Sequence, residues 1–262
     1  MIDYHVHTSL CNHATGSMEQ YVRAAITKGL TTICFLDHLT FQEVGRYNAM
    51  FPWEVPMYVN AARRLDRQYR DQISVRVGLE IDFSPAHVDR CREVVNAFDL
   101  DVVGSSVHFL DGEDVVTRQS AWGCGERNAD EIYAKYLDVM ESMLDYDYFD
   151  VVCHFDLPKK YSRHPSAFAV DGFLNLLEKI GAKNLAVELN TSGLSYPVRE
   201  AFPSPPLLDR CAQLRIPVVT GSDAHSPETV GRDFDKARDL LKEAGYRYLT
   251  GFSHRQRESV AL

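Results

Sequence analysis

Apolar strand-like segments alternate with helix-like segments along the whole chain. The strand-like stretches are rich in β-branched residues and bounded by turns or polar clusters, which is typical of strands buried on both faces. They cover residues 2–8, 31–38, 74–83, 101–109, 149–156, 184–192 and 217–225. Helical spacing of apolar residues is found at roughly 17–29, 55–71, 86–98, 128–144, 170–180, 205–214 and 227–244. The alternation predicts a parallel sheet covered by helices.

The predicted strands end in residues that can bind metal or transfer protons. A closed or distorted (β/α) barrel brings all strand ends to one face, where barrel enzymes keep their active sites. A doubly wound open sheet has the same local pattern, but it would spread these ends along a line. We therefore expect a barrel that forms one domain over residues 1–262. The strand-end residues are His5 and His7, Asp37 and His38, Glu80 and Asp82, His108, His154 and Asp156, Glu188 and Asn190, and Asp223 and His225.

The histidines point to a shared metal cluster. His5 and His7 lie two apart on one predicted strand, so both side chains face the same way. Seven of the ten histidines lie at or just after predicted strand ends. As isolated core residues they would each need a separate buried partner, whereas one cluster of metal ions explains them together. Mixed histidine and carboxylate ligands suit zinc, manganese or iron better than magnesium or calcium.

Composition narrows the partners and the compartment. The formal net charge of −9 argues against a general nucleic-acid binder, which needs clustered Lys and Arg. The six cysteines occur singly, without CxxC pairs, as expected for reduced thiols in the cytoplasm. No apolar run approaches the ~20 residues that span a bilayer, so we expect no membrane contact.

Several motifs, in order, resemble the PHP (polymerase and histidinol phosphatase) superfamily. These are DYHVHTSLCNH at 3–13, LDH at 36–38, GLEID at 78–82, GSSVHFL at 104–110, CHFDLPKKY at 153–161, ELNTSGL at 188–194 and GSDAHSPETVG at 221–231. SVHFL, HFDLPKKY and LNTSGL are most similar to the histidinol-phosphatase branch. The main departure is LDH, where many relatives carry Thr-Glu-His. The resemblance implies a distorted (β/α)7 TIM-like barrel that holds two to three divalent transition-metal ions (Zn, Mn or Fe).

The resemblance also implies a ligand set. Glu80 would bridge the first two metal ions and, with Asp223 and His225, would form part of the catalytic centre. The first ion would be held by His5, His7, Glu80 and Asp223, the second by Glu80, His108 and His154, and the third by His13, His38 and His225. Two adjacent ions lower the pKa of a bridging water, which makes hydroxide available for attack on phosphorus near neutral pH.

Further groups are needed to bind phosphate and to protonate the leaving group. Loop cations are candidates for phosphate contacts, although such residues are usually solvated; they are Lys160, which we favour, and Lys159, Arg163 and Arg118. Asp37 and Asp156 are candidate acids, with orientation of ligating histidines as the favoured role for both. Asn190 is a candidate substrate contact, and a local Asx turn is its alternative role.

Together these features predict a metal-dependent phosphomonoesterase of a small phosphorylated substrate. The resemblance favours release of phosphate from L-histidinol phosphate in histidine biosynthesis. The alternatives are a PHP phosphoesterase acting on another small phosphate or nucleotide, and a catalytically silent metal-binding PHP module.

Overall fold

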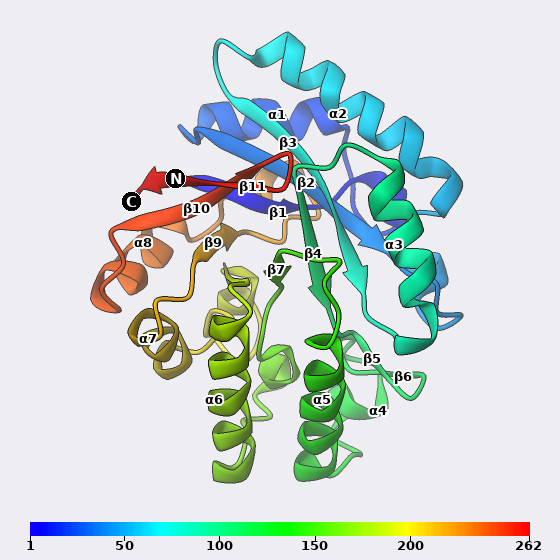
Figure 1. The fold of residues 1–262 in the computed structure, drawn as a ribbon, viewed down its shortest axis with the longest axis vertical. Coiled ribbons are helices and arrows are strands. Elements are labelled where there is room, and N and C mark those ends of the chain that lie inside the picture. Colours follow the sequence, from blue (N-terminus) through cyan, green and yellow to red (C-terminus); the bar gives the residue numbers. More distant parts are fainter.

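Seven parallel strands form the centre of the computed structural model, which describes all of residues 1–262 (Figure 1). Hydrogen-bonded neighbours follow the order β1-β2-β3-β4-β7-β8-β9. Each of the seven predicted strands is confirmed; β2 keeps the predicted length with a shift of one residue, and the other six are shorter than the stretches that predicted them. Their bounds are β1 (Ile2–Val6), β2 (Thr32–Leu39), β3 (Ser74–Asp82), β4 (Val102–Ser106), β7 (Val151–Val152), β8 (Ala186–Asn190) and β9 (Val218–Gly221).

The sheet closes on itself between its first and last strands. The His7 amide donates to the Ala224 carbonyl at 2.9 Å, and the Asp223 amide donates to the His5 carbonyl at 2.8 Å. These bonds join the end of β1 to the segment just after β9, so the predicted distorted barrel is confirmed and the open sheet is wrong. Because β7 has only two residues, the wall is irregular on that side.

Helices surround the strands and bury one apolar face each. The first, α1 (Met18–Thr27), begins with a capping box, in which the Ser17 side chain accepts from the Gln20 amide and the Gln20 side chain accepts from the Ser17 amide. The predicted segment 227–244 contains a helix only from residue 234, after a short 3₁₀ turn at Pro227–Thr229. The bounds are α1 (Met18–Thr27), α2 (Val55–Tyr69), α3 (Val88–Ala97), α4 (Ala121–Cys124), α5 (Ala129–Met143), α6 (Ala167–Ala182), α7 (Pro205–Gln213) and α8 (Phe234–Glu243).

Two hairpins were not predicted. A small one, β5 (Phe109–Leu110) with β6 (Glu113–Asp114), follows the fourth barrel strand. A longer one, β10 (Tyr248–Ser253) with β11 (Gln256–Ala261), ends the chain beside the N-terminus (Figure 1). Its turn is held at the start of the barrel strands, because Arg255 donates to Asp150 at 2.9 Å and Asp101 accepts from the His254 amide at 3.1 Å. The hairpin thus covers the end of the barrel at which the parallel strands begin, opposite the face where their carboxyl ends meet.

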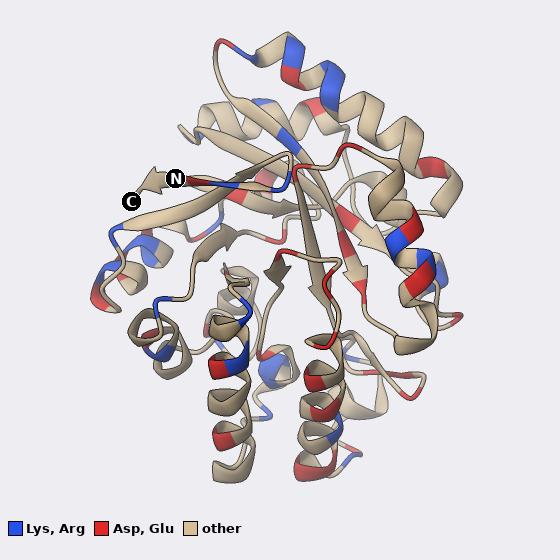
Figure 2. Ribbon diagram, viewed as in Figure 1, with Lys and Arg blue, Asp and Glu red and all other residues tan.

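The surface carries both signs of charge. Lys and Arg lie among Asp and Glu on the outer helices (Figure 2). None of the helices combines the length and the apolar character that crossing a bilayer requires.

Candidate metal centre

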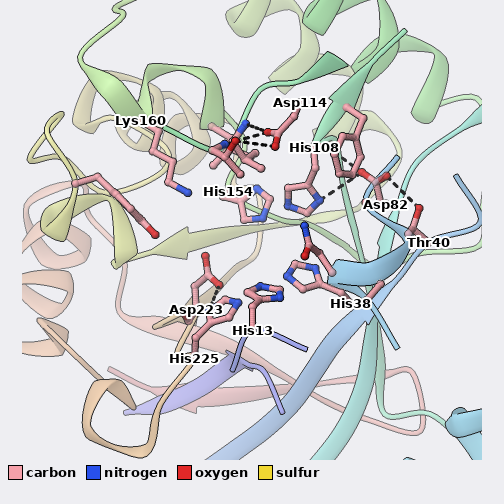
Figure 3. Close-up of a pocket in the computed structure, with 18 of the residues that line it drawn as sticks. His13, His38, Thr40, Asp82, His108, Asp114, His154, Lys160, Asp223 and His225 are labelled. Atoms are coloured by element: carbon pink, nitrogen blue, oxygen red, sulfur yellow. Dashed lines mark hydrogen bonds and ion pairs between the residues drawn. The ribbon is translucent and has the colours of Figure 1, made fainter. Parts of the chain in front are cut away.

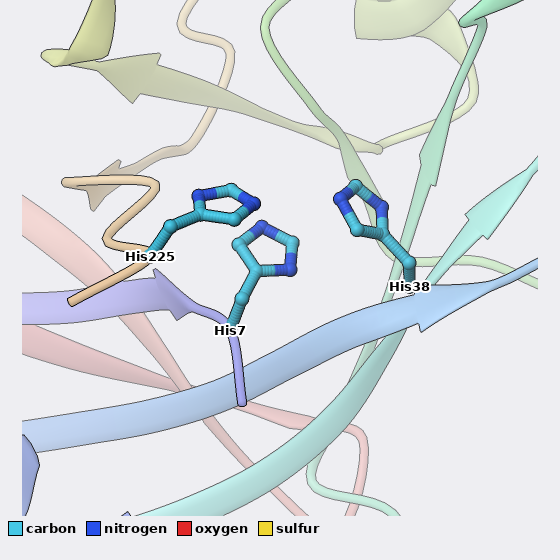
Figure 4. A group of neighbouring side chains, drawn as sticks. All are labelled: His7, His38 and His225. Carbon is cyan, nitrogen blue, oxygen red and sulfur yellow. The ribbon is translucent and has the colours of Figure 1, made fainter. Parts of the chain in front are cut away.

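All nine predicted ligands lie at the same end of the barrel. His5 and His7 lie on or just after β1, His38 on β2 and Glu80 on β3, whereas the other five follow β1, β4, β7 or β9 in loops. The ring centroid of His7 lies 4.1 Å from that of His38 and 4.1 Å from that of His225 (Figure 4). His13, displaced onto the loop after β1, reaches within 4.6 Å of His225 between ring centroids.

Glu80 lies at the centre of the cluster and is fully buried. Its Oε1 lies 2.7 Å from His154 Nε2 and 3.6 Å from His108 Nε2. Its Oε2 lies 3.3 Å from His5 Nε2 and 2.8 Å from His38 Nδ1. The two oxygens therefore face different groups of imidazoles, which is the arrangement that a carboxylate between two metal ions requires.

Two predicted ligands have unusual backbone conformations, one in the loop after β7 and the other in the loop after β9. His154 has φ of 25° and Asp223 has φ of 52°, in the left-handed region that few residues other than glycine adopt. The conformation after β9 places Asp223 Oδ1 3.0 Å from His7 Nε2. Such backbone strain is common at functional sites, where the surrounding structure holds it in place.

Buried atoms without hydrogen-bond partners test whether a metal ion fits here. His5 Nε2, Glu80 Oε2 and His225 Nε2 are all buried and form no hydrogen bond, and the imidazole nitrogens close to Glu80 Oε2 do not have hydrogen-bond geometry. Leaving such atoms unsatisfied costs about 1–3 kcal/mol each, so a partner is expected. Ligand atoms of His7, His38 and His225 also converge within 4.8 Å of one another. A set of imidazole nitrogens with carboxylate oxygens is the donor set of transition metals, so these residues fit the group.

Most of the imidazoles are oriented through Nδ1. Glu188 Oε1 lies 2.7 Å from His5 Nδ1, and the Cys11 carbonyl lies 2.7 Å from His13 Nδ1. An oxygen at Nδ1 selects the tautomer whose Nε2 carries the lone pair that binds metal. The same role fits three further oxygens, which are Asp37 Oδ1 at His7 (3.3 Å), Asp82 Oδ1 at His108 (3.3 Å) and the Asp223 carbonyl at His225 (3.0 Å).

The pKa directions favour the ligating forms of several groups. Burial alone would raise the pKa of Glu80, but His5 and His108, whose own pKa values are raised by nearby carboxylates, hold it well below the usual value, so Glu80 is ionised. Burial and the neighbouring His7 lower the pKa of His38 to about 3 and that of His225 to about 2. His38 and His225 are therefore neutral near pH 7, with a lone pair available for a cation.

A cavity of about 590 Å³ opens above the cluster (Figure 3). Six of the nine predicted ligands line it, whereas His5, His7 and Glu80 are buried beneath. Two cationic side chains also line it, Lys160 and Arg232. Lys160 Nζ lies 4.1 Å from the centre of the Tyr196 ring and has no carboxylate partner among the ion pairs of the structure, so its charge is available to a ligand.

The other predicted cations do not reach the cavity. Lys159 is 1% exposed, and its ammonium contacts Asp156 and Glu200, each at 3.0 Å. Arg163 stacks on Trp122 and donates to the Arg127 carbonyl. Arg118 lies over the Tyr161 ring. Within the 3₁₀ turn at Leu157–Tyr161, Lys159 is buried in the protein whereas the next residue, Lys160, lines the cavity.

Asn190 and the two candidate acids, Asp37 and Asp156, are buried and contact other groups of the protein. Asn190 Oδ1 accepts from the Ser192 amide at 2.9 Å, which is the Asx turn given as its alternative role. Asp37 accepts from the Thr8 amide and contacts His7, so it holds a predicted ligand in place. Asp156 contacts Lys159 and accepts from the Ser204 amide, away from the imidazoles.

Three residues of the site were not assigned roles from the sequence. Glu188 and Asp82 end predicted strands, and that position was the signal that could have marked them as partners of His5 and His108. Arg232 donates to the Ser222 and Asp223 carbonyls, at 3.2 and 3.1 Å, and so holds the loop that carries Asp223. No motif distinguishes Arg232 from other surface arginines.

Comparisons with known proteins agree on one family. The sequence model of the PHP domain family matches residues 3–192, and the sequence model of a PHP-associated family matches residues 208–234. A probable histidinol-phosphatase of Deinococcus radiodurans is 35% identical over 98% of both chains, and the histidinol-phosphatase of Lactococcus lactis is 27% identical over 96% of this chain and 94% of that protein. The crystal structure of histidinol phosphate phosphatase from Lactococcus lactis, with zinc, L-histidinol and phosphate, has a TM-score of 0.87 at 23% identity and covers 98% of both chains.

Proposed function

Because this chain belongs to the PHP domain family, we propose that its barrel end hydrolyses a small phosphomonoester, L-histidinol phosphate, to L-histidinol and phosphate. The observation that carries the proposal is the convergence of all nine expected ligands beneath one cavity. It is supported by the near-complete overlap with a probable histidinol-phosphatase at 35% identity. The reaction would belong to histidine biosynthesis, and six unpaired cysteines, five of them buried, suit the cytoplasm.

The proposed ligand groups follow the two oxygens of Glu80. The groups are His5, His7 and Asp223 with Glu80, then His108 and His154 with Glu80, and then His13, His38 and His225. Glu80 Oε1 faces the second group at 2.7 and 3.6 Å, and Oε2 faces His5 at 3.3 Å. His38 lies near Glu80 Oε2 as well, and it lines the cavity with His13 and His225, which fits a third ion near the entrance. Two to three ions of zinc, manganese or iron would occupy these groups.

The residues of the chain divide the work of the reaction. Bound divalent ions would supply an activated water and offset the charge of the phosphoryl group. Asp37 and Glu188 hold His7 and His5 in orientation, and the buried floor of the cavity keeps these contacts away from bulk water. Lys160, half-buried at the cavity wall, is placed to bind phosphate oxygens.

Replacing Lys160 with methionine should lower kcat/KM about 10- to 100-fold, since a hydrogen bond between charged groups contributes about 1.5–3 kcal/mol. Methionine keeps a long unbranched side chain but removes the charge. The measurement is steady-state phosphate release, with the exposed Lys179 changed to methionine as the matched control. A Lys160→Arg variant should retain most of the activity. Unchanged kcat/KM in Lys160→Met would exclude Lys160 from phosphate binding.

Substrate selectivity tests the proposed function directly. L-histidinol phosphate should be hydrolysed with a kcat/KM at least about a hundredfold above that of p-nitrophenyl phosphate or a mononucleotide, roughly 2.7 kcal/mol of transition-state discrimination. Phosphate release by the metal-loaded protein from each compound is the measurement. Of the loop carboxylates close to the strand ends, Asp114 lines the cavity, and its oxygens accept hydrogen bonds from the amides of Val116 and Thr117 and from the Thr117 hydroxyl.

The alternatives appear as other outcomes of this comparison. Preference for a nucleotide or another small phosphate would keep the phosphoesterase chemistry and remove the role in histidine biosynthesis. Metal binding without hydrolysis of any compound would identify a silent PHP module.

A further inference from the structure

We propose that Glu188 is a positioning residue that fixes the tautomer of His5 and the backbone of His154, and so couples two ligand groups of the metal centre. The inference rests on the proposed metal binding, but it concerns a residue outside the proposed ligand set. Glu188 lies on β8, which stands between β7 and β9 in the barrel wall, and is 1% exposed. Its buried carboxylate orients His5 and is given no contact with the substrate.

The two carboxylate oxygens contact ligands on opposite sides. Oε1 lies 2.7 Å from His5 Nδ1 and accepts from Asn190 Nδ2 at 3.1 Å. Oε2 accepts from the His154 amide at 2.8 Å. His5 belongs to the ligand group on Glu80 Oε2, and His154 to the group on Glu80 Oε1. One side chain of β8 therefore connects ligands of β1 with those that follow β7.

The space around this carboxylate is shaped to hold it. A Cβ built on Gly221 would overlap Glu188 Oε1 and would lie 2.6 Å from the Cβ of His5. Any side chain at position 221 would displace one of them, because backbone and buried neighbours leave no room. The glycine at the end of β9 thus permits the approach of Glu188 to His5.

Carboxylate chemistry determines which nitrogen of His5 can bind metal. An ionised carboxylate only accepts hydrogen bonds, so His5 Nδ1 must carry the proton that it shares with Glu188. In the neutral imidazole that metal binding requires, the lone pair is then on Nε2, which points toward Glu80 Oε2 and has no hydrogen-bond partner. Glu188 thereby selects the ligating tautomer.

His154 depends on the other oxygen. Its backbone has φ of 25°, a conformation that costs of order 1–3 kcal/mol unless the surroundings compensate. In this conformation the His154 amide donates to Glu188 Oε2 at 2.8 Å, and His154 Nε2 lies 2.7 Å from Glu80 Oε1. The contacts of Glu188 with His5 Nδ1 and with the His154 amide each need an acceptor oxygen, and an amide side chain has only one.

The variant Glu188→Gln separates this role from simple packing. Glutamine keeps the shape but offers one acceptor and one donor group. With its NH₂ toward His5, it would favour the tautomer whose Nε2 is protonated and cannot bind metal, and with its NH₂ toward His154, it would oppose a backbone donor. Zinc affinity, measured by competition with a chelator, should fall at least about tenfold, within the range for partners of metal ligands.

The matched control is Asp101→Asn, which changes a fully buried carboxylate that also accepts a backbone amide, that of Val77, but touches no proposed ligand. It should lower the melting temperature and leave zinc affinity unchanged. If Glu188→Gln behaves in the same way, with wild-type zinc affinity below its melting temperature, Glu188 is only a packing residue and the proposal is wrong. Zinc affinity is independent of substrate, so this result is distinct from failure of the proposed phosphatase activity.

A measurement on the unmodified protein covers the case in which Glu188→Gln does not fold. ¹⁵N NMR of histidine-labelled, zinc-loaded protein should show His5 protonated at Nδ1 and bound through Nε2. Binding through Nδ1, or an Nε2 that carries a proton, would overturn the assignment of the tautomer to Glu188.

Discussion

Replacing Glu80 with glutamine should lower kcat for L-histidinol phosphate by at least about a thousandfold, or roughly 4 kcal/mol of transition-state stabilisation. Glu80 places Oε1 near His108 and His154, and Oε2 near His5 and His38, so both oxygens are committed to different ligand groups. The amide of glutamine has one acceptor oxygen and no charge, so it cannot serve both groups. The measurement is phosphate release at saturating substrate and metal.

The matched control is Glu178→Gln on α6, where an exposed carboxylate pairs with Arg210 at 3.0 Å and lies outside the cavity. It should leave kcat unchanged. Far-UV circular dichroism of the Glu80 variant should match that of the wild type. A Glu80→Gln variant that folds, loads metal and retains kcat within about tenfold of wild type would refute the bridging role.

Removing the metal ions should lower the melting temperature by at least about 10 °C, which is the effect expected from a single ion. An ion held at a thousandfold excess over its dissociation constant stabilises the folded state by about 4 kcal/mol, and each kcal/mol corresponds to about 2–4 °C in a chain of this size. Without a cation, His5 Nε2, Glu80 Oε2 and His225 Nε2 stay buried and unpaired. Calorimetry before and after treatment with a chelator measures the change.

Return of zinc should restore the melting temperature, whereas calcium, which prefers a shell of oxygen ligands, should not. Elemental analysis of the restored protein should give two to three transition-metal ions per chain. A melting temperature that is the same with and without chelator, in a protein that carries no metal, would contradict the metal centre.

The sequence predicts the barrel and the gathering of strand-end residues at one face because both depend on local patterns, whereas the ligand set was implied by the family resemblance. Apolar strands fix the sheet, and a residue at a strand end such as His38 or Glu80 is brought to the active face by topology alone. The terminal hairpin was missed because β11 reads as a run of exposed polar residues, and its turn at His254 and Arg255 contains no glycine. Its position depends on the distant carboxylates Asp101 and Asp150.

The sequence does not reveal which of two neighbouring loop side chains is buried and which faces the cavity. Lys159 and Lys160 are chemically equivalent in the sequence, yet Lys159 is buried with Glu200 while Lys160 lines the cavity. The difference arises from a single 3₁₀ turn, whose phase no periodic pattern reveals. Arg232 likewise contacts the Asp223 carbonyl through a loop whose course depends on tertiary packing.

The closure of the barrel between β1 and the segment after β9 has a consequence for folding. It joins His5 to Asp223 and His7 to Ala224, pairs that are separated by almost the whole length of the chain. Such contacts pay the largest loop-closure entropy and form slowly. A chain whose synthesis has not yet passed β9 contains His5 and His7 but lacks Asp223 and His225. The metal centre can therefore be completed only after synthesis has passed the last barrel strand, and metal capture becomes a late event in the life of each new chain.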